Sequence, residues 1–469
     1  MDVDWSVGPY QLRPYQIRTI ERLRESISRL RKEKKPAHIV LQSICASGKT
    51  VMASKIAQLT EQKGGRFLFI VSGRSLISQT SEKFAECEIR HGILMAGSEN
   101  SIDHEWAVHH RGRIHEMPVV IASRDTYGSR VFNRKCIEAL DVDVIVCDEI
   151  HAGIGGTVYQ RLLNENLDKV FLGLTATPSR AGGYGFGPPF QEIVIGGTHE
   201  ELLKEGFIVD PVCFGPKTVD MQGVKISRST GEYVQAQAEA RWNKDELVGD
   251  ILRDWRKYGN DTPTVIFAQG VEHSKHIAAN FCGHGIPALH LDADSPLNER
   301  KKAYKALASG ELKIVSNFGI LRIGVDIPQI GCGILACSMA SINPYLQATG
   351  RIIRGCNSVY WNNGGPKNRV VLVDHGGNIR KHGWPTEDRF WTLDPEKDAE
   401  EFNKEKKEEE GKKEIPVLHC VKCGAEWQAT DGNLCPRCGY KKQSLGSAPS
   451  FDGQELGRIK KSAAKPVPR

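Results

Sequence analysis

The sequence has no apolar run long enough to cross a membrane. Spanning the hydrocarbon core takes about 18 or more apolar residues, and the 469-residue chain contains no such run. Residues 1–5 also lack the basic start and apolar stretch of a secretory signal. We therefore expect no membrane partner.

An excess of one charge and a disulfide-type cysteine pattern are also missing. The formal net charge is +6, which is small for this length and does not by itself indicate a nucleic-acid partner. Of the 13 cysteines, four form two Cys-x-x-Cys pairs near the C-terminus and the others are scattered. Scattered thiols fit a reducing compartment better than a disulfide framework, so we expect a cytoplasmic protein.

Short apolar segments alternate with helical stretches over residues 37–210. Buried strands separated by helices indicate a parallel sheet with both faces covered. In such sheets, ligands bind beyond the carboxyl ends of the strands. The strands expected here are residues 38–41, 67–71, 118–121, 142–146 and 170–174.

The same alternation returns in the second half, where the expected strands are 265–267, 288–291, 313–316, 333–336 and 370–373. The sequence therefore predicts an α/β fold with two parallel-sheet domains in tandem. We expect these domains at 1–208 and 209–392, a charged linker at 393–415, a cysteine-containing module at 416–442 and a disordered tail at 443–469.

A loop suited to phosphate follows the first strand, at residues 43–50. It opens a helix, whose N-terminus and backbone N–H groups favour an anion. After Gly48, Lys49 would reach the β- and γ-phosphates of ATP, and the Thr50 hydroxyl would bind Mg²⁺. Ser43 stands where the general pattern has glycine, so a plain strand-to-helix turn is the alternative for this loop alone.

Two adjacent carboxylates, Asp148 and Glu149, follow a strand of valine and isoleucine. Charges at the end of a buried strand are costly unless something uses them. Asp148 could hold Mg²⁺ directly or through water, and Glu149 could orient and deprotonate the attacking water. The alternative, a helix N-cap with an acidic first turn, loses weight because the lysine loop occurs in the same domain.

Four motifs occur in a familiar order: Gly-Lys-Thr at 48–50, Asp-Glu-Ile-His at 148–151, Thr-Ala-Thr-Pro at 175–178 and Gln-Ala-Thr-Gly-Arg-Ile-Ile-Arg at 347–354. Together they resemble superfamily-two helicases of the DEAD/DEAH type. A Leu-Arg-Pro-Tyr-Gln element at 12–16 makes the chain more similar to phage and bacterial members. The resemblance implies two RecA-like domains that use ATP and Mg²⁺ to act on nucleic acid, with DNA preferred over RNA.

The resemblance also implies roles for single residues of the first domain. Gln16 matches a glutamine that reads adenine, although a polar residue that caps the following helix is the alternative. Thr175 and Thr177, together with His151, match residues that couple hydrolysis to domain movement.

Two loops of the first domain match positions that contact the nucleic-acid backbone. They contain Arg74 and Ser123. A guanidinium and a hydroxyl group suit phosphate oxygens. Loop residues of these types are also common without function, so the assignment depends on the resemblance.

In the second domain, the resemblance implies residues that complete the ATP site. Asp326, in a Gly-x-Asp-x-Pro element, would contact the ribose or an arginine, and Gln347 would position water. Arg351 and Arg354 would act on the γ-phosphate, Arg354 being the first choice. A basic surface patch is the alternative. The segment 374–378, Asp-His-Gly-Gly-Asn, is typical of the phage-like subgroup and has no assigned role.

Ala46 departs from the family, which usually has glycine at this position of the phosphate loop. Alanine fits if its φ is negative and is strained if its φ is positive. Because Lys49 and Thr50 are intact, we still expect an active ATPase.

Four cysteines have the spacing of a structural zinc site: Cys420, Cys423, Cys435 and Cys438. Four thiolates make a closed tetrahedral Zn²⁺ site, and so polar a segment needs the metal in order to fold. A redox dithiol is the alternative. Whether this zinc ribbon would bind nucleic acid or protein stays open.

The predicted function is an ATP-dependent helicase or translocase that acts on DNA. An RNA helicase and the motor subunit of a restriction system use the same chemistry and are alternatives. A nucleic-acid-binding scaffold with a degenerate ATP site is a further alternative, supported by Ala46 alone.

Overall fold

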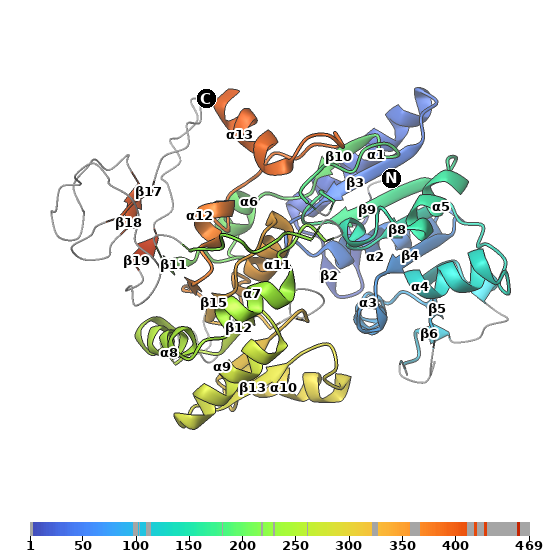
Figure 1. Cartoon of the computed structure of the whole chain (residues 1–469). Helices are drawn as coiled ribbons and strands as arrows, with labels where there is room; N and C mark the ends of the chain where they lie inside the picture. Colours follow the sequence, from blue (N-terminus) through green and yellow to red (C-terminus); the bar gives the residue numbers. More distant parts are fainter. Residues whose placement is uncertain are drawn as a thin grey trace. The chain divides into compact units, whose positions relative to one another are not determined.

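The chain divides into two compact units (Figure 1). Unit 1 comprises residues 1–202 and 390–399, and unit 2 comprises residues 203–389 and 400–469. The computed structural model describes residues 3–96, 102, 104–108, 114–180, 182–216, 219–227, 230–259, 261–320, 327–356, 366–409, 417–419, 426–428 and 457–459. The chain thus leaves unit 1 before the expected boundary at 208/209 and returns to it at residue 390, three residues before the expected linker begins.

Unit 1 is built on an eight-stranded sheet in which all neighbouring strands are parallel. From edge to edge its strands are β10 (Glu192–Ile195), β3 (Ala37–Gln42), β9 (Val170–Thr175), β8 (Val144–Cys147), β4 (Phe67–Val71), β7 (Val119–Ser123), β5 (His91–Leu94) and β6 (Ala107–Val108). A small antiparallel hairpin, β1 (Ser6–Val7) and β2 (Tyr10–Gln11), precedes it.

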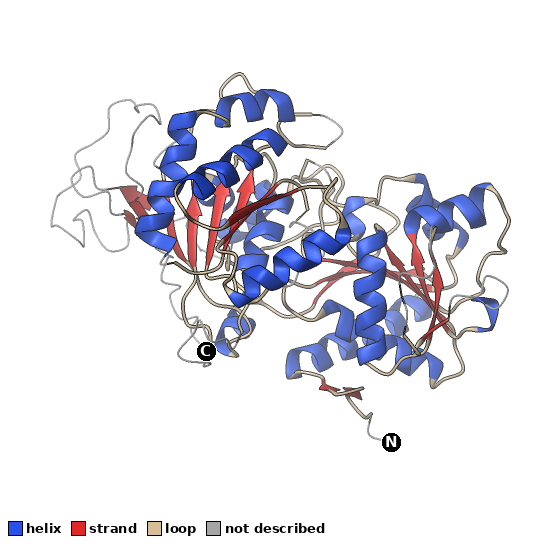
Figure 2. Cartoon of the chain, turned by 90° about the horizontal axis from the view of Figure 1, so that it is seen from below, coloured by secondary structure: helices blue, strands red, loops and turns tan. Residues whose placement is uncertain are grey.

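Alternate residues of each strand face opposite sides of this sheet and fill two cores. In β4, Phe67 and Phe69 pack into one core, and Leu68 and Ile70 pack into the other. Helices cover both faces of the sheet (Figure 2). The first core receives α1 (Pro14–Lys32), α2 (Lys49–Glu61) and α3 (Arg74–Glu86); the second receives α4 (Arg124–Tyr127), the π-helix η3 (Gly128–Asn133) and α5 (Thr157–Glu165).

Unit 2 contains a seven-stranded sheet, parallel except at one edge. Its order is β13 (Ala288–Leu291), β14 (Ile314–Asn317), β12 (Thr264–Ala268), β15 (Cys332–Ala336), β16 (Val371–Asp374), β11 (Val212–Gly215) and the antiparallel β19 (Gly457–Ile459). Its helices include α7 (Gln235–Trp242), α8 (Asp245–Asp254), α9 (Val271–Gly283), α10 (Leu297–Ser309), α11 (Ile342–Ile352) and α12 (Asn378–His382). Side chains of α8 and α9 fill a core on one face of the sheet.

The prediction of two α/β domains is confirmed, and each of the predicted strands is present. The sequence reasoning missed β5, β10 and β11, which are short and interrupted by polar residues or glycine. It also missed the short helix α6 (His199–Lys204). Among the described residues, no helix is both long and apolar enough to span a bilayer.

Residues 390–399 return to unit 1 and pack on the glycine-rich segment 182–187. At Gly185, a Cβ atom would lie 2.4 Å from the carbonyl oxygen of Asp394, so only glycine allows this approach. The helix α13 (Ala399–Glu409) follows. Part of the segment expected to be a linker is therefore a packed strap and part is a helix.

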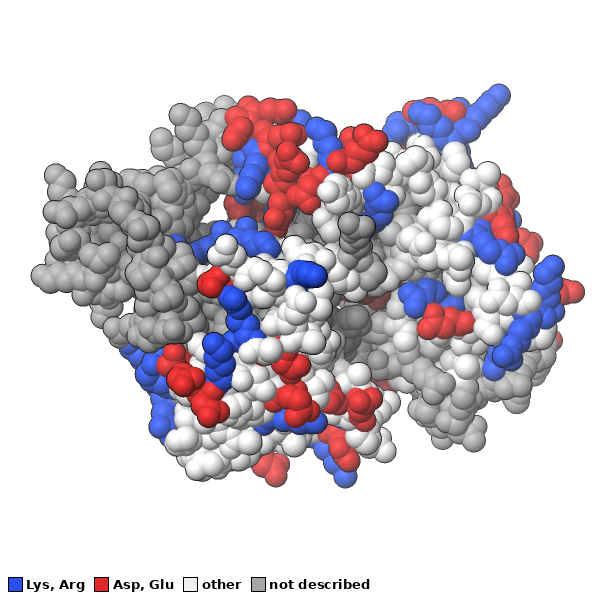
Figure 3. All heavy atoms as spheres, viewed as in Figure 1, with Lys and Arg blue, Asp and Glu red and all other residues white. Residues whose placement is uncertain are grey.

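Most of the net charge of the chain lies on one helix. Residues 14–35 contain eight Lys or Arg and three Glu, so they contribute 8 − 3 = +5 of the formal +6. In Figure 3, Lys and Arg side chains gather at the upper right, over α1, with some acidic side chains among them. The remainder of the chain is therefore close to neutral, and the net charge describes this one segment.

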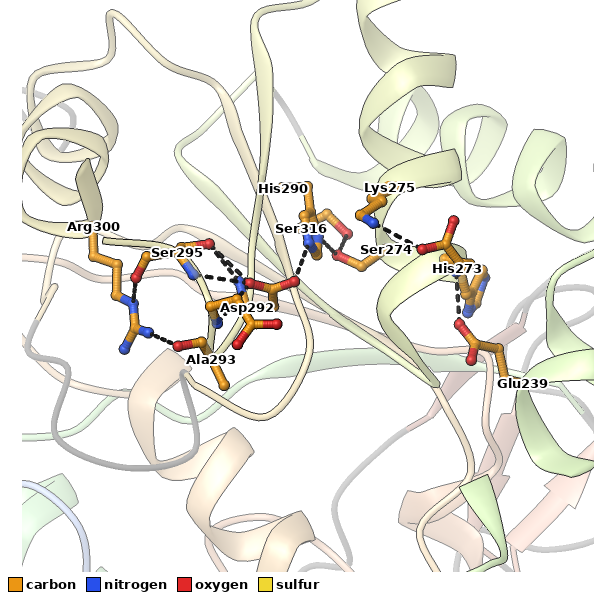
Figure 4. A network of polar contacts seen from close by, with 12 residues as sticks. Glu239, His273, Ser274, Lys275, His290, Asp292, Ala293, Ser295, Arg300 and Ser316 are labelled. Atoms are coloured by element: carbon orange, nitrogen blue, oxygen red, sulfur yellow. Dashed lines mark hydrogen bonds and ion pairs between the residues drawn. The ribbon is translucent and has the colours of Figure 1, made fainter. Parts of the chain in front are cut away.

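A polar network in unit 2, buried at its two serines and partly exposed at His290 and Asp292, joins α9 to β13 and β14 (Figure 4). His290 Nδ1 lies 2.7 Å from Ser274 Oγ, and its Nε2 lies 3.0 Å from Asp292 Oδ2. Ser274 Oγ also lies 2.8 Å from Ser316 Oγ. This order of groups is that of a hydrolase triad. Because Ser274 is fully buried, no substrate reaches its hydroxyl, and the network serves to fix the strand ends.

Candidate ATP-binding and hydrolysis site

The phosphate loop joins β3 to α2 and is closed by its own polar groups. The hydroxyl oxygens of Ser43 and Ser47 lie 2.6 Å apart, and the backbone N–H of Ser43 donates to the carbonyl of Thr175 at 2.9 Å. Lys49 Nζ donates to the carbonyl of Ser43 at 3.0 Å, so the ammonium group lies over the loop. Ser43, which replaces the expected glycine, is fully buried and helps to close the loop.

Ala46 adopts the strained one of the two backbone conformations considered for it. Its φ is +72°, in the left-handed region that glycine favours. A non-glycine residue there costs roughly 1–2 kcal/mol. Gly48 has a similar φ of +75°, and a Cβ atom at that position would lie 2.6 Å from Gln16 Nε2. The loop therefore keeps glycine where space requires it and carries strain at Ala46.

Gln16 connects α1 to the phosphate loop. Its Oε1 accepts from the backbone N–H of Arg13 at 2.9 Å, and its Nε2 donates to the carbonyl of Ser47 at 2.9 Å. The hydroxyl of Tyr15 donates to the same carbonyl at 2.7 Å. The helix-capping role considered for Gln16 is therefore present, and the contact to adenine stays a prediction.

The acidic motif lies beside the phosphate loop because β3, β9 and β8 are consecutive strands of one sheet. Asp148 follows β8, and its carboxylate accepts from the backbone N–H of Glu149 at 3.0 Å. Glu149 has a φ of +47°, the second strained non-glycine residue of this site. Its carboxylate lies 3.3 Å from His151 Nδ1.

His151 joins the acidic motif to the end of β9. Its Nδ1 lies 2.9 Å from Thr175 Oγ1, which donates to the carbonyl of Thr177 at 3.0 Å. The Thr175 hydroxyl donates its proton to the carbonyl of Thr177, so it can only accept from His151. Nδ1 of a neutral His151 therefore carries the hydrogen and donates it to Thr175 Oγ1. Burial lowers the pKa of His151, and nearby Lys49 lowers it further while Glu149 opposes the shift. His151 is therefore neutral at pH 7.

The loops expected to contact nucleic acid lie at a neighbouring part of the same sheet edge. Ser123 ends β7 and pairs in register with Val71, which ends β4. Ser123 is the N-cap of α4, and Arg74 begins α3. The backbone thus places both positions at adjacent strand ends, where helix N-termini are suited to phosphate.

In unit 2, the predicted residues lie on and just after α11. Gln347 is buried in the helix, and Arg351 lies in its last turn. Arg354 follows the helix, and its backbone forms an isolated antiparallel β-bridge with Ile208. Asp326 lies outside the described residues, as do the predicted zinc ligands Cys420, Cys423, Cys435 and Cys438.

Two charged residues at the ends of α11 escaped the sequence reasoning. Glu232 accepts from the backbone at the start of the helix, and Lys367 donates to its last turn. Neither residue belongs to a motif. Glu232 is 109 positions from its partner Ser341, so no local pattern could reveal it.

Two domain families match the chain. Residues 9–180 match the family described as type III restriction enzyme, res subunit, and residues 243–356 match the helicase conserved C-terminal domain. Together they indicate a superfamily-two helicase. The chain is thus an enzyme that hydrolyses ATP with Mg²⁺ and acts on nucleic acid.

Curated relatives extend the similarity along the chain. A 51.5 kDa protein of Lactococcus phage (isolate 7-9) is 27% identical over 402 residues, which cover 86% of this chain and 77% of that protein. A Schizosaccharomyces pombe protein, named as a mitochondrial ATP-dependent helicase, is 26% identical over 200 residues. That match covers 41% of this chain and 32% of the yeast protein.

Solved structures share the fold. The ATP-dependent type ISP restriction-modification enzyme LlaBIII bound to DNA has a TM-score of 0.53 and 16% identity, over 77% of this chain and 27% of that one. The DUF1998 helicase MrfA bound to DNA and AMPPNP has a TM-score of 0.53 and 18% identity, over 80% of this chain and 50% of that one. At these identities the likeness establishes the two-domain helicase fold.

Proposed function

We propose that this helicase acts on DNA, along which it moves or which it remodels as it hydrolyses ATP. The single observation that carries the proposal is the cluster at the carboxyl ends of the adjacent strands β3, β9 and β8. Lys49 follows β3, Thr175 ends β9, and Glu149 and His151 follow β8. The preference for DNA is supported by the similar structures of LlaBIII and MrfA, both of which are bound to DNA.

In the proposed mechanism, each group of unit 1 has one task. Lys49 neutralises the β- and γ-phosphates above the N-terminus of α2. Thr50 and Asp148 would hold Mg²⁺, which would supply positive charge beside the phosphate oxygens. Glu149 accepts the proton of the attacking water. Gln16 contacts adenine through the donor and acceptor capacity that its two described hydrogen bonds leave.

The remaining residues transmit or complete the reaction. His151, Thr175 and Thr177 connect the carboxylate of Glu149 to the end of β9, so a change at the phosphate can reach the next loop. Arg351 and Arg354 stabilise the γ-phosphoryl group in the transition state.

On the same proposal, Gln347 positions the attacking water and Asp326 contacts the ribose. Arg74 and Ser123 hold the DNA backbone, with little dependence on its sequence.

ATP hydrolysis measured in parallel with single-stranded DNA, duplex DNA, forked DNA and RNA tests this proposal. We expect DNA to stimulate turnover more than RNA, and Lys49→Ala to abolish turnover with every nucleic acid. Stimulation by RNA alone would identify an RNA helicase. A chain that binds DNA and hydrolyses no ATP would be a scaffold instead.

A restriction motor is the second candidate. It is favoured by the description of the family that matches residues 9–180 and by the fold shared with LlaBIII. A motor that moves along duplex DNA displaces a third strand from a triplex but leaves a forked duplex paired. A helicase separates the fork. Comparing the two substrates with the same preparation distinguishes the candidates.

We also propose that Cys420, Cys423, Cys435 and Cys438 form a structural zinc site. The support is their spacing and the antiparallel pair of β17 (Val417–His419) and β18 (Glu426–Gln428), since the sequence between these strands contains the first Cys-x-x-Cys pair. We expect about one zinc per chain by elemental analysis, and loss of that zinc in the Cys420→Ser/Cys423→Ser variant. Zinc content unchanged in that variant would contradict the site.

A further inference from the structure

Side chains from three other segments hold the loop that leads into α11. This loop, residues 337–341, joins β15 to the helix on which Gln347 and Arg351 lie. Its hydrogen bonds include Asn378 Nδ2 to Cys337 O (2.8 Å), Ser338 N to Gln269 Oε1 (2.9 Å), Met339 N to Asn378 Oδ1 (2.8 Å), Ala340 N to Glu232 Oε2 (2.9 Å), Lys381 Nζ to Ala340 O (2.8 Å) and Ser341 N to Glu232 Oε1 (3.0 Å).

The N-terminus of α11 is capped by a residue distant in sequence. Ser341 occupies the N-cap position, but its own side chain makes no capping bond. Glu232 accepts from the backbone N–H groups of Ala340 and Ser341 and from the Ser341 hydroxyl. A carboxylate at this end also has the sign that the helix dipole favours. Glu232 thus fixes the backbone of the two residues that precede the helix, and with it the direction in which the helix starts.

The Asp-His-Gly-Gly-Asn segment supports the same loop. Asp374 accepts from Asn378 Nδ2 at 2.8 Å and from the backbone N–H of Ile379 at 2.7 Å. These bonds orient the Asn378 amide, which bonds both Cys337 and Met339. Asp374 and Asn378 are buried, so none of these groups has water as a substitute partner.

The C-terminal end of α11 is held by a buried lysine. Lys367 Nζ donates to the carbonyl of Ile352 at 2.8 Å and to that of Pro328 at 3.3 Å. It therefore joins the last turn of α11, between Arg351 and Arg354, to the proline that follows Asp326 by two positions. Ile352 also packs on β15 at Gly333, where a Cβ atom would lie 2.1 Å from its Cδ1.

We propose that Glu232 and Lys367 are positioning residues that hold α11 at its two ends, so that unit 2 presents Arg351 and Arg354 in one fixed geometry. This inference depends on the proposed function, in which those arginines act on ATP. Displacing a catalytic group by about 1 Å can cost on the order of 100-fold in rate. The two contacts therefore affect turnover although neither residue touches the nucleotide.

A double-mutant cycle with Glu232→Gln and Arg354→Ala tests the proposal in the full chain. Glutamine keeps the shape of the side chain but has only one oxygen that accepts. One of the two backbone N–H groups, of Ala340 or Ser341, therefore loses its acceptor. We expect kcat with saturating DNA to fall roughly 10- to 100-fold, with the affinity for a fluorescent ATP analogue unchanged and the variant still folded at the assay temperature. In the Arg354→Ala background, Glu232→Gln should lower kcat by a clearly smaller factor, because only Arg351 is left to be displaced.

Equal losses of kcat in both backgrounds would overturn the proposal, because Glu232 would then act independently of the arginine. A lost affinity for the ATP analogue would also overturn it. If Arg354→Ala and Arg351→Ala each leave kcat unchanged, the arginine assignment of the proposed function has failed, which the single variants reveal by themselves. Glu246→Gln, an exposed carboxylate in the first turn of α8, is the matched control and should change nothing.

Lys367→Met provides the test at the other end of the helix. It removes both carbonyl contacts while keeping side-chain length, and we expect the same pattern of reduced kcat and unchanged nucleotide affinity. Amide hydrogen exchange in the last turn of α11 should increase. Unchanged kcat in a folded Lys367→Met variant would exclude Lys367 from this role.

Discussion

The two units hold the side chains that are proposed to act on ATP by opposite means. In unit 1, the candidate site contains two strained residues, Ala46 and Glu149, both with positive φ. In unit 2, the described loop before α11 contains no such residue and is fixed by side chains from distant segments. Strain at an active site costs roughly 1–3 kcal/mol per residue and persists only where its surroundings impose it. The comparison suggests a pre-formed phosphate site in unit 1 and an externally aligned arginine helix in unit 2.

Removing the charge of Glu149 should have the largest effect on the unit 1 side of this comparison. Glu149→Gln keeps the shape of the strained residue but cannot accept a proton from water. We expect kcat to fall by about 10²- to 10⁴-fold, with ATP still bound. ATPase assays and equilibrium binding of a fluorescent ATP analogue measure the two quantities. Hydrolysis at the original rate would show that the acidic motif has been misassigned.

Acid should weaken unit 2 through a buried histidine. Burial lowers the pKa of His273 from 6.5 to about 3, so the unfolded chain binds the extra proton between these values. The contribution of neutral His273 to the stability of unit 2 is therefore fully present above pH 6.5 and is lost as the pH falls towards 3. The loss is about 2 kcal/mol at pH 5. His273→Asn can still accept from the backbone N–H of Gln269, as Nδ1 does at 3.2 Å.

The comparison of chemical denaturation at pH 7.5 and pH 5 measures this effect. The variant should lose about 2 kcal/mol less than the original chain on acidification. The same pH dependence in both proteins would show that His273 is accessible to protons in the folded state.

Ala46→Gly should give the smallest effect and tests the strain directly. Glycine adopts a φ of +72° without a Cβ clash, so we expect the free energy of unfolding of unit 1 to rise by up to about 1 kcal/mol. Ala53→Gly, in α2, is the matched control, because it removes a buried methyl group from an ordinary helical position and should destabilise the unit. A loss of stability in both variants would exclude strain at Ala46.

The sequence was sufficient wherever a local pattern reflects burial or chemistry. The apolar strands β3, β4, β8 and β9 are buried on both faces, which their continuous Val, Ile, Leu and Phe content predicted. The phosphate loop and the acidic motif were found because each directly follows such a strand. The φ of Ala46 could be framed as a question but not answered, because it depends on how the closed loop is packed.

Contacts between distant segments were beyond the sequence reasoning. Glu232 lies in a polar stretch with no motif, and its acceptors become useful only when folding brings Ser341 beside it. Lys367 resembles a surface lysine in the sequence but is buried in the structure. The role of the Asp-His-Gly-Gly-Asn segment became visible only through the bonds of Asp374 and Asn378.

The strap at residues 390–399 has a consequence for anyone who divides this protein. A fragment that ends near residue 208 would lack the piece that bonds Gly187 through the carbonyl of Leu393, and would expose the glycine-rich bed beneath it. The complementary fragment would carry that piece as an unattached flap. When the two fragments are co-expressed, residues 390–399 of the second should therefore bind the first, as in split-protein reconstitution. For the same reason, a single proteolytic cut near residue 208 would not separate the two pieces.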